Sequence, residues 1–214
     1  MTITFTMTAG DLVTRAMQNR RCLALGRTPT AAEMAYGLER LNLLLKPLAR
    51  YEGTQWAADE ATATVTAGNA NVTLSPRPGR VVSVGLVLSA TNERPLARWE
   101  IGQYDVLPNK ASVGDPTLYV VRETTAGVSL RVWPVPSANR TLNYRYIRVP
   151  DDVEQATAVD VPQDWLQDIE NVLADDLTAF ANGNPDLPGK AAYSRRLMED
   201  RARPDSYFFE PDCA

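Results

Sequence analysis

The fold of this chain is decided by residues 98–150, which read RWEIGQYDVLPNKASVGDPTLYVVRETTAGVSLRVWPVPSANRTLNYRYIRVP. Apolar and polar residues alternate here in short runs separated by proline, glycine and asparagine, which is the pattern of short strands. Helical patterns lie on both sides of the segment. Helices outside and a β module inside predict a packed helical base from which a separate contact surface projects. This organisation is typical of a component of an assembly rather than of an enzyme.

Strand patterns continue upstream of this segment. Residues 61–65 and 72–74 are expected to pair with each other around a turn at 67–70. Residues 80–88, RVVSVGLVL, form an apolar β-branched run that predicts a strand buried on both sides.

Six short strands at this spacing predict a small antiparallel β sandwich or partly open barrel. The expected strands are 61–65, 72–74, 80–88, 118–122, 128–133 and 141–147. Residues 99–107 do not alternate cleanly, so we expect a short helical or irregular excursion there. Trp99, Trp133 and Trp165 are expected to anchor the core.

Two helices are expected before the insertion. The first lies between Thr8 and Gly26, where apolar residues recur close to the 3.6 period and glycine supplies the stop. The second opens with Thr30-Ala-Ala-Glu33, in which the threonine and glutamate side chains can satisfy each other's free backbone N–H groups. It continues as a leucine stripe that faces the core: Leu38, Leu41, Leu44, Leu45 and Leu48. Pro47 should kink or terminate its last turn.

A second pair of helices is expected after the insertion. The first begins in Asp160-Val-Pro-Gln-Asp-Trp165 and ends at residues 182–185, NGNP. Its apolar face consists of Trp165, Ile169, Val172, Leu173 and Phe180. The second begins near Leu187-Pro188, and its apolar face consists of Ala191, Tyr193, Leu197 and Met198.

The two helices after the insertion carry opposite charges on their polar sides. The acidic residues are Asp164, Asp168, Glu170, Asp175 and Asp176, and the basic residues are Arg195, Arg196 and Arg201. These faces either organise contacts between subunits or are simply solvated, since exposed ion pairs contribute only about 0–1 kcal/mol.

The expected fold class is therefore α+β. A body of about four helices comes from residues 1–54 and 158–201, and residues 55–157 form the inserted antiparallel β module. Residues 202–214 are expected to form an extended C-terminal arm.

Composition narrows the classes of function. The 214 residues fit one domain with an inserted subdomain, and a net charge of −4 predicts no general attraction to nucleic acid. Histidine is absent and only two cysteines occur, which removes the usual catalytic triads and zinc sites and predicts no cofactor. We expect no secretion signal and no membrane span, and synthesis in a reducing cytoplasm.

Several short sequences, in their order and spacing, resemble the head-to-tail connector proteins of tailed bacteriophages, and of short-tailed phages in particular. These proteins are also called adaptors, head completion proteins or tail accessory factors. The resemblance runs from about Asp11 to Arg201 and contains no catalytic signature. The sequences are Tyr51–Trp56, Tyr104, Pro108–Ser112, Gly114–Tyr119, Leu130–Pro136, Tyr144–Tyr146, Asp151-Asp152 and Val161–Trp165.

The resemblance implies a ring of about twelve copies beneath the portal vertex of the virion. That ring would bind the portal protein, prolong the DNA channel and offer a platform to the next tail component, a nozzle or tail-tube protein. Double-stranded DNA would pass through the lumen without sequence-specific binding. The helical body would form the ring, and the β module would face a neighbouring subunit or the next tail ring.

The arm is the candidate partner-binding segment. Three aromatic residues, Tyr207, Phe208 and Phe209, follow Arg201 and Arg203, and such a segment gains little unless it is buried against a partner. We expect it to dock on the portal protein or on a neighbouring subunit. The alternative is that it folds back onto its own helices.

An enzyme reading must rely on carboxylates. Glu100 with Asp105, or Asp151 with Asp152 and Glu154, are candidates for the acid and base of a peptidoglycan-degrading hydrolase. The simpler interpretation is that these carboxylates cap turns or are solvated, and we expect no catalytic residues.

Overall fold

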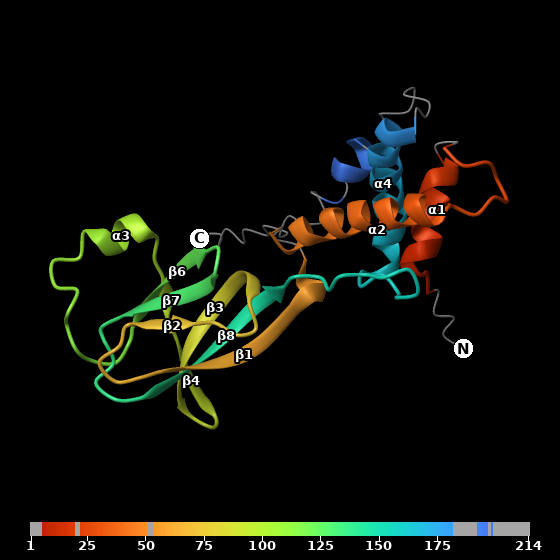
Figure 1. Cartoon of the computed structure of the whole chain (residues 1–214). Helices are drawn as coiled ribbons and strands as arrows, with labels where there is room; N and C mark the ends of the chain where they lie inside the picture. Colours follow the sequence, from red (N-terminus) through yellow and green to blue (C-terminus); the bar gives the residue numbers. More distant parts are fainter. Residues whose placement is uncertain (1–5, 20–21, 51–53, 182–191, 197, 199–214) are drawn as a thin grey trace, which may run out of the picture. The chain divides into compact units, whose positions relative to one another are not determined.

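Our structure, a computed structural model, describes residues 6–19, 22–50, 54–181, 192–196 and 198, and excludes the side chains of 179–181. The chain divides into two compact units (Figure 1). The helical unit combines the described parts of Met1–Trp56 and Pro150–Ala214, and the β unit is Ala57–Val149. This is an α+β chain.

The helical unit contains short 3₁₀ helices besides its α-helices. Its elements are α1 (Ala9–Asn19), α2 (Ala31–Leu45), η1 (Lys46–Arg50), η2 (Gln55–Ala57, whose last residue opens the β unit), η3 (Gln163–Trp165) and α4 (Leu166–Ala181). Residues 192–196 and 198 are also helical. α1, α2 and α4 pack on one another around one apolar core.

Helix α2 begins where its sequence predicts. The Thr30 hydroxyl accepts from the Glu33 N–H at 3.3 Å, and a Glu33 carboxylate oxygen accepts from the Thr30 N–H at 2.7 Å. At the other end the α-helix stops at Leu45 and continues as 3₁₀ turns that contain Pro47. Because proline lacks the N–H that an α-helix needs, this change of helix type is its expected effect.

The core of the helical unit is built from the predicted faces. Trp165 is 4% exposed and meets Trp56 edge-on, with 6.2 Å between ring centroids. Met198 is buried, but Tyr193 is 63% exposed, so its assignment to the apolar face of the last helix was wrong. The Phe180 side chain, Ala191 and Leu197 lie outside the described residues.

The chain returns from the β unit along α1 and α2. The Asn42 side chain accepts from the Val153 N–H at 2.8 Å and donates to the Val153 carbonyl at 3.1 Å. Two residues later, the Gln155 carbonyl accepts from the Gly10 N–H at 3.0 Å. A Cβ on Gly10 would lie 2.9 Å from that oxygen, so the backbone approach requires glycine.

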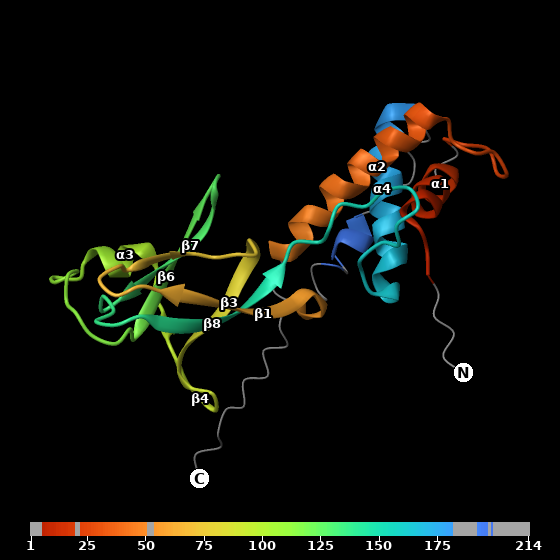
Figure 2. The ribbon, with the colours of Figure 1, turned by 60° about the horizontal axis from the view of Figure 1, so that its bottom comes forward.

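Within the described residues the β unit holds two four-stranded sheets, ordered β1-β8-β3-β4 and β2-β7-β6-β5 (Figures 1 and 2). The first comprises β1 (Ala58–Val65), β3 (Pro78–Ser89), β4 (Asn92–Pro95) and β8 (Arg140–Arg148). The second comprises β2 (Asn71–Thr73), β5 (Ala97–Arg98), β6 (Leu118–Thr124) and β7 (Gly127–Trp133). Residues from both sheets fill one core, among them Leu86, Leu130, Leu142 and Tyr144, which makes the unit a small sandwich.

The expected pairing of 61–65 with 72–74 was wrong. β1 pairs antiparallel with β8, while β2 pairs with β7 in the other sheet. The turn between β1 and β2 therefore carries the chain from one sheet to the other, and Gly68 in this turn has a φ of 75°. The pairing of a strand is decided by partners that are distant in sequence, and a local sequence pattern does not identify those partners.

β3 is not buried on both sides as expected. Val82 is 40% and Leu88 47% exposed, whereas Val81, Val84 and Leu86 are buried. The register on β8 shifts between Val81 and Ser83, and this irregularity redirects the side chains. β4 and β5 were not predicted, and β5 pairs with β6 in parallel, so the module is not wholly antiparallel.

The excursion at 99–107 is confirmed as a short helix, α3 (Ile101–Asp105), which lies beside β6 (Figure 2). Tyr104 is the buried residue of this helix, with the Arg131 guanidinium 4.8 Å from the centre of its ring. Trp99 and Trp133 are only partly buried against this cluster, so they anchor the core less completely than Trp165 does.

Candidate partner-binding surfaces

An ion-pair cluster lies on the helical unit where α2 meets α4. Asp176 on α4 accepts a 2.8 Å hydrogen bond from the Arg40 guanidinium of α2 and lies 3.9 Å from that of Arg195. The hydrogen bond to Asp176 and its charge raise the pKa of Arg40. All three side chains remain partly exposed, so the pairs hold geometry more than they add stability.

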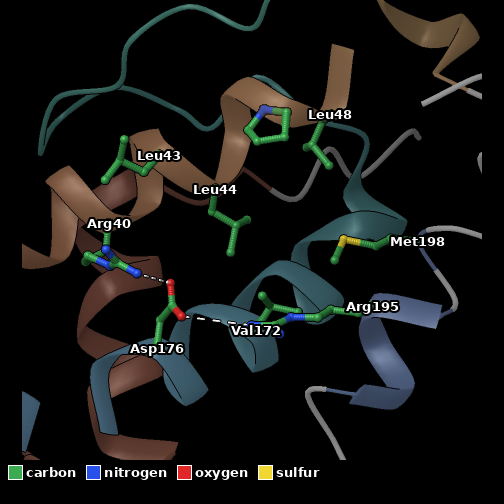
Figure 3. Close-up of a pocket in the computed structure, with 9 residues that line it drawn as sticks. Arg40, Leu43, Leu44, Leu48, Val172, Asp176, Arg195 and Met198 are labelled. Carbon is green, nitrogen blue, oxygen red and sulfur yellow. Dashed lines mark hydrogen bonds and ion pairs between the residues drawn. The ribbon is translucent and has the colours of Figure 1, made fainter. Parts of the chain in front are cut away.

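An apolar groove of about 240 Å³ adjoins this cluster (Figure 3). We call it the Asp176 groove, and its lining is Arg40, Leu43, Leu44, Pro47, Leu48, Val172, Asp176, Arg195 and Met198. Leu43 is 56% exposed, while Leu48, Val172 and Met198 are buried. The groove thus presents an apolar floor with two guanidinium groups and one carboxylate at its rim.

Three apolar residues in and after α3 of the β unit are exposed. Ile101, Val106 and Val113 are 48%, 80% and 66% exposed. The loop after α3 is held by a hydrogen bond in which the Trp133 indole N–H donates to the Asn109 carbonyl at 2.9 Å. We treat these three residues as candidate contact residues.

The model of the SU10 adaptor protein family matches residues 7–206. The chain belongs to this family. It is a structural adaptor protein of a bacteriophage virion, and it contacts other head and tail proteins. A search of curated proteins finds no match for it.

The charged helix faces are partly engaged within the adaptor itself. Asp176 pairs with Arg40 and Arg195, and Glu170 accepts from the Asn19 side chain at 3.2 Å. Asp168 is 7% exposed. The acidic face is therefore not simply solvated, since part of it joins the helices of one subunit.

Two residues of the hydrolase alternative, Glu100 and Asp152, occupy a helix cap and an ion pair. Glu100 caps α3, and its N–H donates to the Gln103 side chain at 3.0 Å. Asp152 lies 2.7 Å from the Lys46 ammonium. Neither proposed set lines the Asp176 groove.

The described part of the adaptor contains no group of three histidine, cysteine or acidic residues placed to hold a metal ion. Among those same residues, no helix has both the length and the apolar character that crossing a bilayer requires.

The predicted partner-binding residues Arg201, Arg203, Tyr207, Phe208 and Phe209 all lie outside the described residues. Sequence reasoning missed Arg40 and Leu43 of the groove. Leu43 offered a signal, because it falls outside the leucine stripe and therefore leaves an apolar side chain on the outer face of α2. Arg40 offered none, since its partner Asp176 is distant in the sequence.

Proposed function

We propose that this adaptor forms a ring of about twelve copies between the portal vertex and the tail of a short-tailed phage. The helical body, residues 1–54 and 158–201, forms the ring, and residues 55–157 supply the contact with the neighbouring subunit or the next tail component. The arm, residues 202–214, supplies a further contact. The ring prolongs the DNA channel at the head–tail junction.

The family match over residues 7–206 carries this proposal. Two further observations support it. The helical unit presents the Asp176 groove, and the β unit carries the exposed apolar residues Ile101, Val106 and Val113. The net charge of −4 suits a lumen through which duplex DNA slides, because a strongly basic ring would hold the phosphates.

Native mass spectrometry of the adaptor alone and after mixing with its phage's portal protein tests the proposal. We expect a discrete complex with one adaptor copy per portal subunit. An adaptor that stays monomeric and binds no portal protein would contradict the ring and require another position in the virion.

The mechanism is binding without catalysis. Glu100 is the N-cap residue of α3 and Asp105 is its last residue, so the variants Glu100→Gln and Asp105→Asn should leave assembly with the portal unchanged. Peptidoglycan hydrolysis by the purified adaptor that these substitutions remove would establish the hydrolase alternative instead.

A further inference from the structure

We propose that the Asp176 groove binds residues 205–212, Asp-Ser-Tyr-Phe-Phe-Glu-Pro-Asp, of a second copy of this chain. The inference deepens the proposed function, on which it rests, because it assigns the arm's partner: the neighbouring subunit of the ring. The arm then links each subunit to the next.

The chemistry of the groove selects the kind of segment that it binds. Its floor is aliphatic, and Leu43 leaves more than half of its surface to solvent. At the rim, the two guanidinium groups of Arg40 and Arg195 share the single carboxylate of Asp176. Among the described residues that line the groove, two arginines therefore face one carboxylate, and Glu39 next to Arg40 adds a negative charge outside the lining. The lining itself favours a ligand that is apolar with an acidic flank.

The segment at 205–212 has the complementary composition. Its aromatic triplet Tyr207–Phe209 is preceded by Asp205 and followed by Glu210 and Asp212. Between residues 204 and 214 no lysine or arginine occurs. Aromatic side chains that fill an apolar groove, with carboxylates directed at arginines on the rim, combine the two main sources of interface affinity.

The chain leaves the described structure at the groove itself. Met198, the last described residue, is a lining residue, and Arg195 one turn earlier belongs to the rim. The ten residue-to-residue steps from Met198 to Phe208 span at most about 33–36 Å when fully extended. That is roughly three helix diameters, which is sufficient to reach a neighbouring subunit.

The sequence favours a neighbouring copy over the chain's own groove. Return to its own groove requires a reversal within residues 199–206, which include Pro204. Proline disfavours helical backbone for the residue before it, which applies to Arg203 and to Glu210. This sequence preference favours a segment that reaches a neighbouring copy.

Photocrosslinking between isotopically distinct copies tests the inference in the full chain. p-Benzoylphenylalanine replaces Phe208, and ¹⁵N-labelled and unlabelled adaptor are mixed as denatured chains and refolded together. After irradiation, mass spectrometry identifies the peptide crosslinked to residue 208 and the isotope of each partner. We expect crosslinks to peptides that contain Leu43, Leu44 or Met198, with mixed light–heavy pairs as frequent as random pairing predicts.

A matched pair of arginine variants controls for charge. Arg195→Glu should reduce the yield of the groove crosslink roughly ten-fold, because it reverses the charge on the rim. Arg196→Glu makes the same change on the next, exposed residue, which does not line the groove, and should leave the yield unchanged. Equal losses in both variants would overturn the proposal.

The remaining outcomes are also decisive. Crosslinks confined to light–light and heavy–heavy pairs mean that the arm folds back on its own chain. Crosslinks outside the groove mean that the arm has another partner site. Either result overturns the proposal.

Portal binding of the same preparation is measured by native mass spectrometry. A portal complex without groove crosslinks would refute the groove inference alone, and mixed groove crosslinks without a portal complex would refute the ring adaptor alone.

Discussion

A Cβ atom placed on Gly37 of α2 would lie 2.3 Å from Cγ1 of Val13 on α1. The two helices therefore approach each other at a position where only a hydrogen atom fits. Val13 is fully buried, and its β-branched side chain has one strongly preferred rotamer in a helix, so it cannot swing away. The close approach of α1 to α2 at this point therefore requires glycine at position 37.

Gly37→Ala should destabilise the helical unit. Overpacking costs about 1–3 kcal/mol, and the better helix propensity of alanine returns about 0.5–1 kcal/mol, so the net loss should be on the order of 1 kcal/mol. Urea denaturation followed by circular dichroism measures it. Gly102→Ala in α3 is the control, because a Cβ there meets nothing within 4 Å. Equal stability of the two variants would contradict the close approach.

The reciprocal cap of α2 formed by Thr30 and Glu33 predicts that the stability of the helical unit depends on pH. Hydrogen bonds from the Thr30 backbone N–H and hydroxyl lower the pKa of Glu33. The folded pKa lies below the unfolded one, so this contribution is complete above the ordinary pKa of about 4.3 and is lost as the pH falls through both values. In thermal melts, the stability difference between the wild type and Glu33→Gln should therefore shrink below about pH 4. A difference that stays constant from pH 7 to pH 3 would argue against this role.

The cap itself can be tested at neutral pH. Thr30→Ala removes the side chain that accepts from the Glu33 N–H, and should lower the free energy of unfolding by about 1 kcal/mol. Thr28→Ala, at an exposed loop position two residues earlier, should have little effect. Chemical denaturation of both variants provides the comparison.

Buried tyrosines predict loss of stability at alkaline pH. Burial raises the pKa of Tyr119, Tyr144 and Tyr146, and the Tyr144 hydroxyl donates to the Ser75 carbonyl at 3.0 Å. Their pKa values in the folded state exceed the value of about 10 in the unfolded state. Their contribution to stability is therefore fully present below about pH 10 and is lost as the pH rises through the folded pKa values. Tyr144→Phe should make this decline shallower in denaturation curves between pH 8 and 11. An unchanged slope would show that Tyr144 does not contribute to it.

Replacing Asn42 by alanine should destabilise the protein more than replacing an asparagine of the β unit. Asn42→Ala leaves the N–H and carbonyl of buried Val153 without their side-chain partner, which costs about 1–3 kcal/mol. Asn139→Ala removes an exposed hydrogen bond to the Ala67 N–H and should cost clearly less. The two variants are compared in the same denaturant titration, and a reversed order would contradict the argument.

Local signals predicted the local features of this fold. Thr30 and Glu33 are three residues apart, so their sequence alone specifies the cap of α2. Pro47 acts through its own missing N–H, and the change to 3₁₀ turns follows from it. Trp165, the first residue of a predicted apolar face, is buried in the core. In each case the physical cause lies within one or two turns of chain.

Features that depend on distant partners were not predictable in this way. Val65 and Val72 flank a turn and read as a hairpin, yet Val65 pairs with Arg140 and Val72 with Leu130. β4 is four residues long, polar and ends in Pro95, so no strand pattern identifies it. In the groove, Asp176 was identified only as part of an acidic face, because its partner Arg40 lies on a helix far away in the sequence.

The pairing of β1 with β8 has a consequence for how the chain is made. β1 leaves the ribosome early, but its partner residues are synthesised about 75 to 90 positions later, a delay of several seconds at roughly 5–20 residues per second. α1 remains without its packing partner for longer still, because the α4 residues that cover its apolar face follow the entire β unit. Both nascent surfaces stay accessible to chaperones during this interval, and the helical unit can close only after α4 has been synthesised.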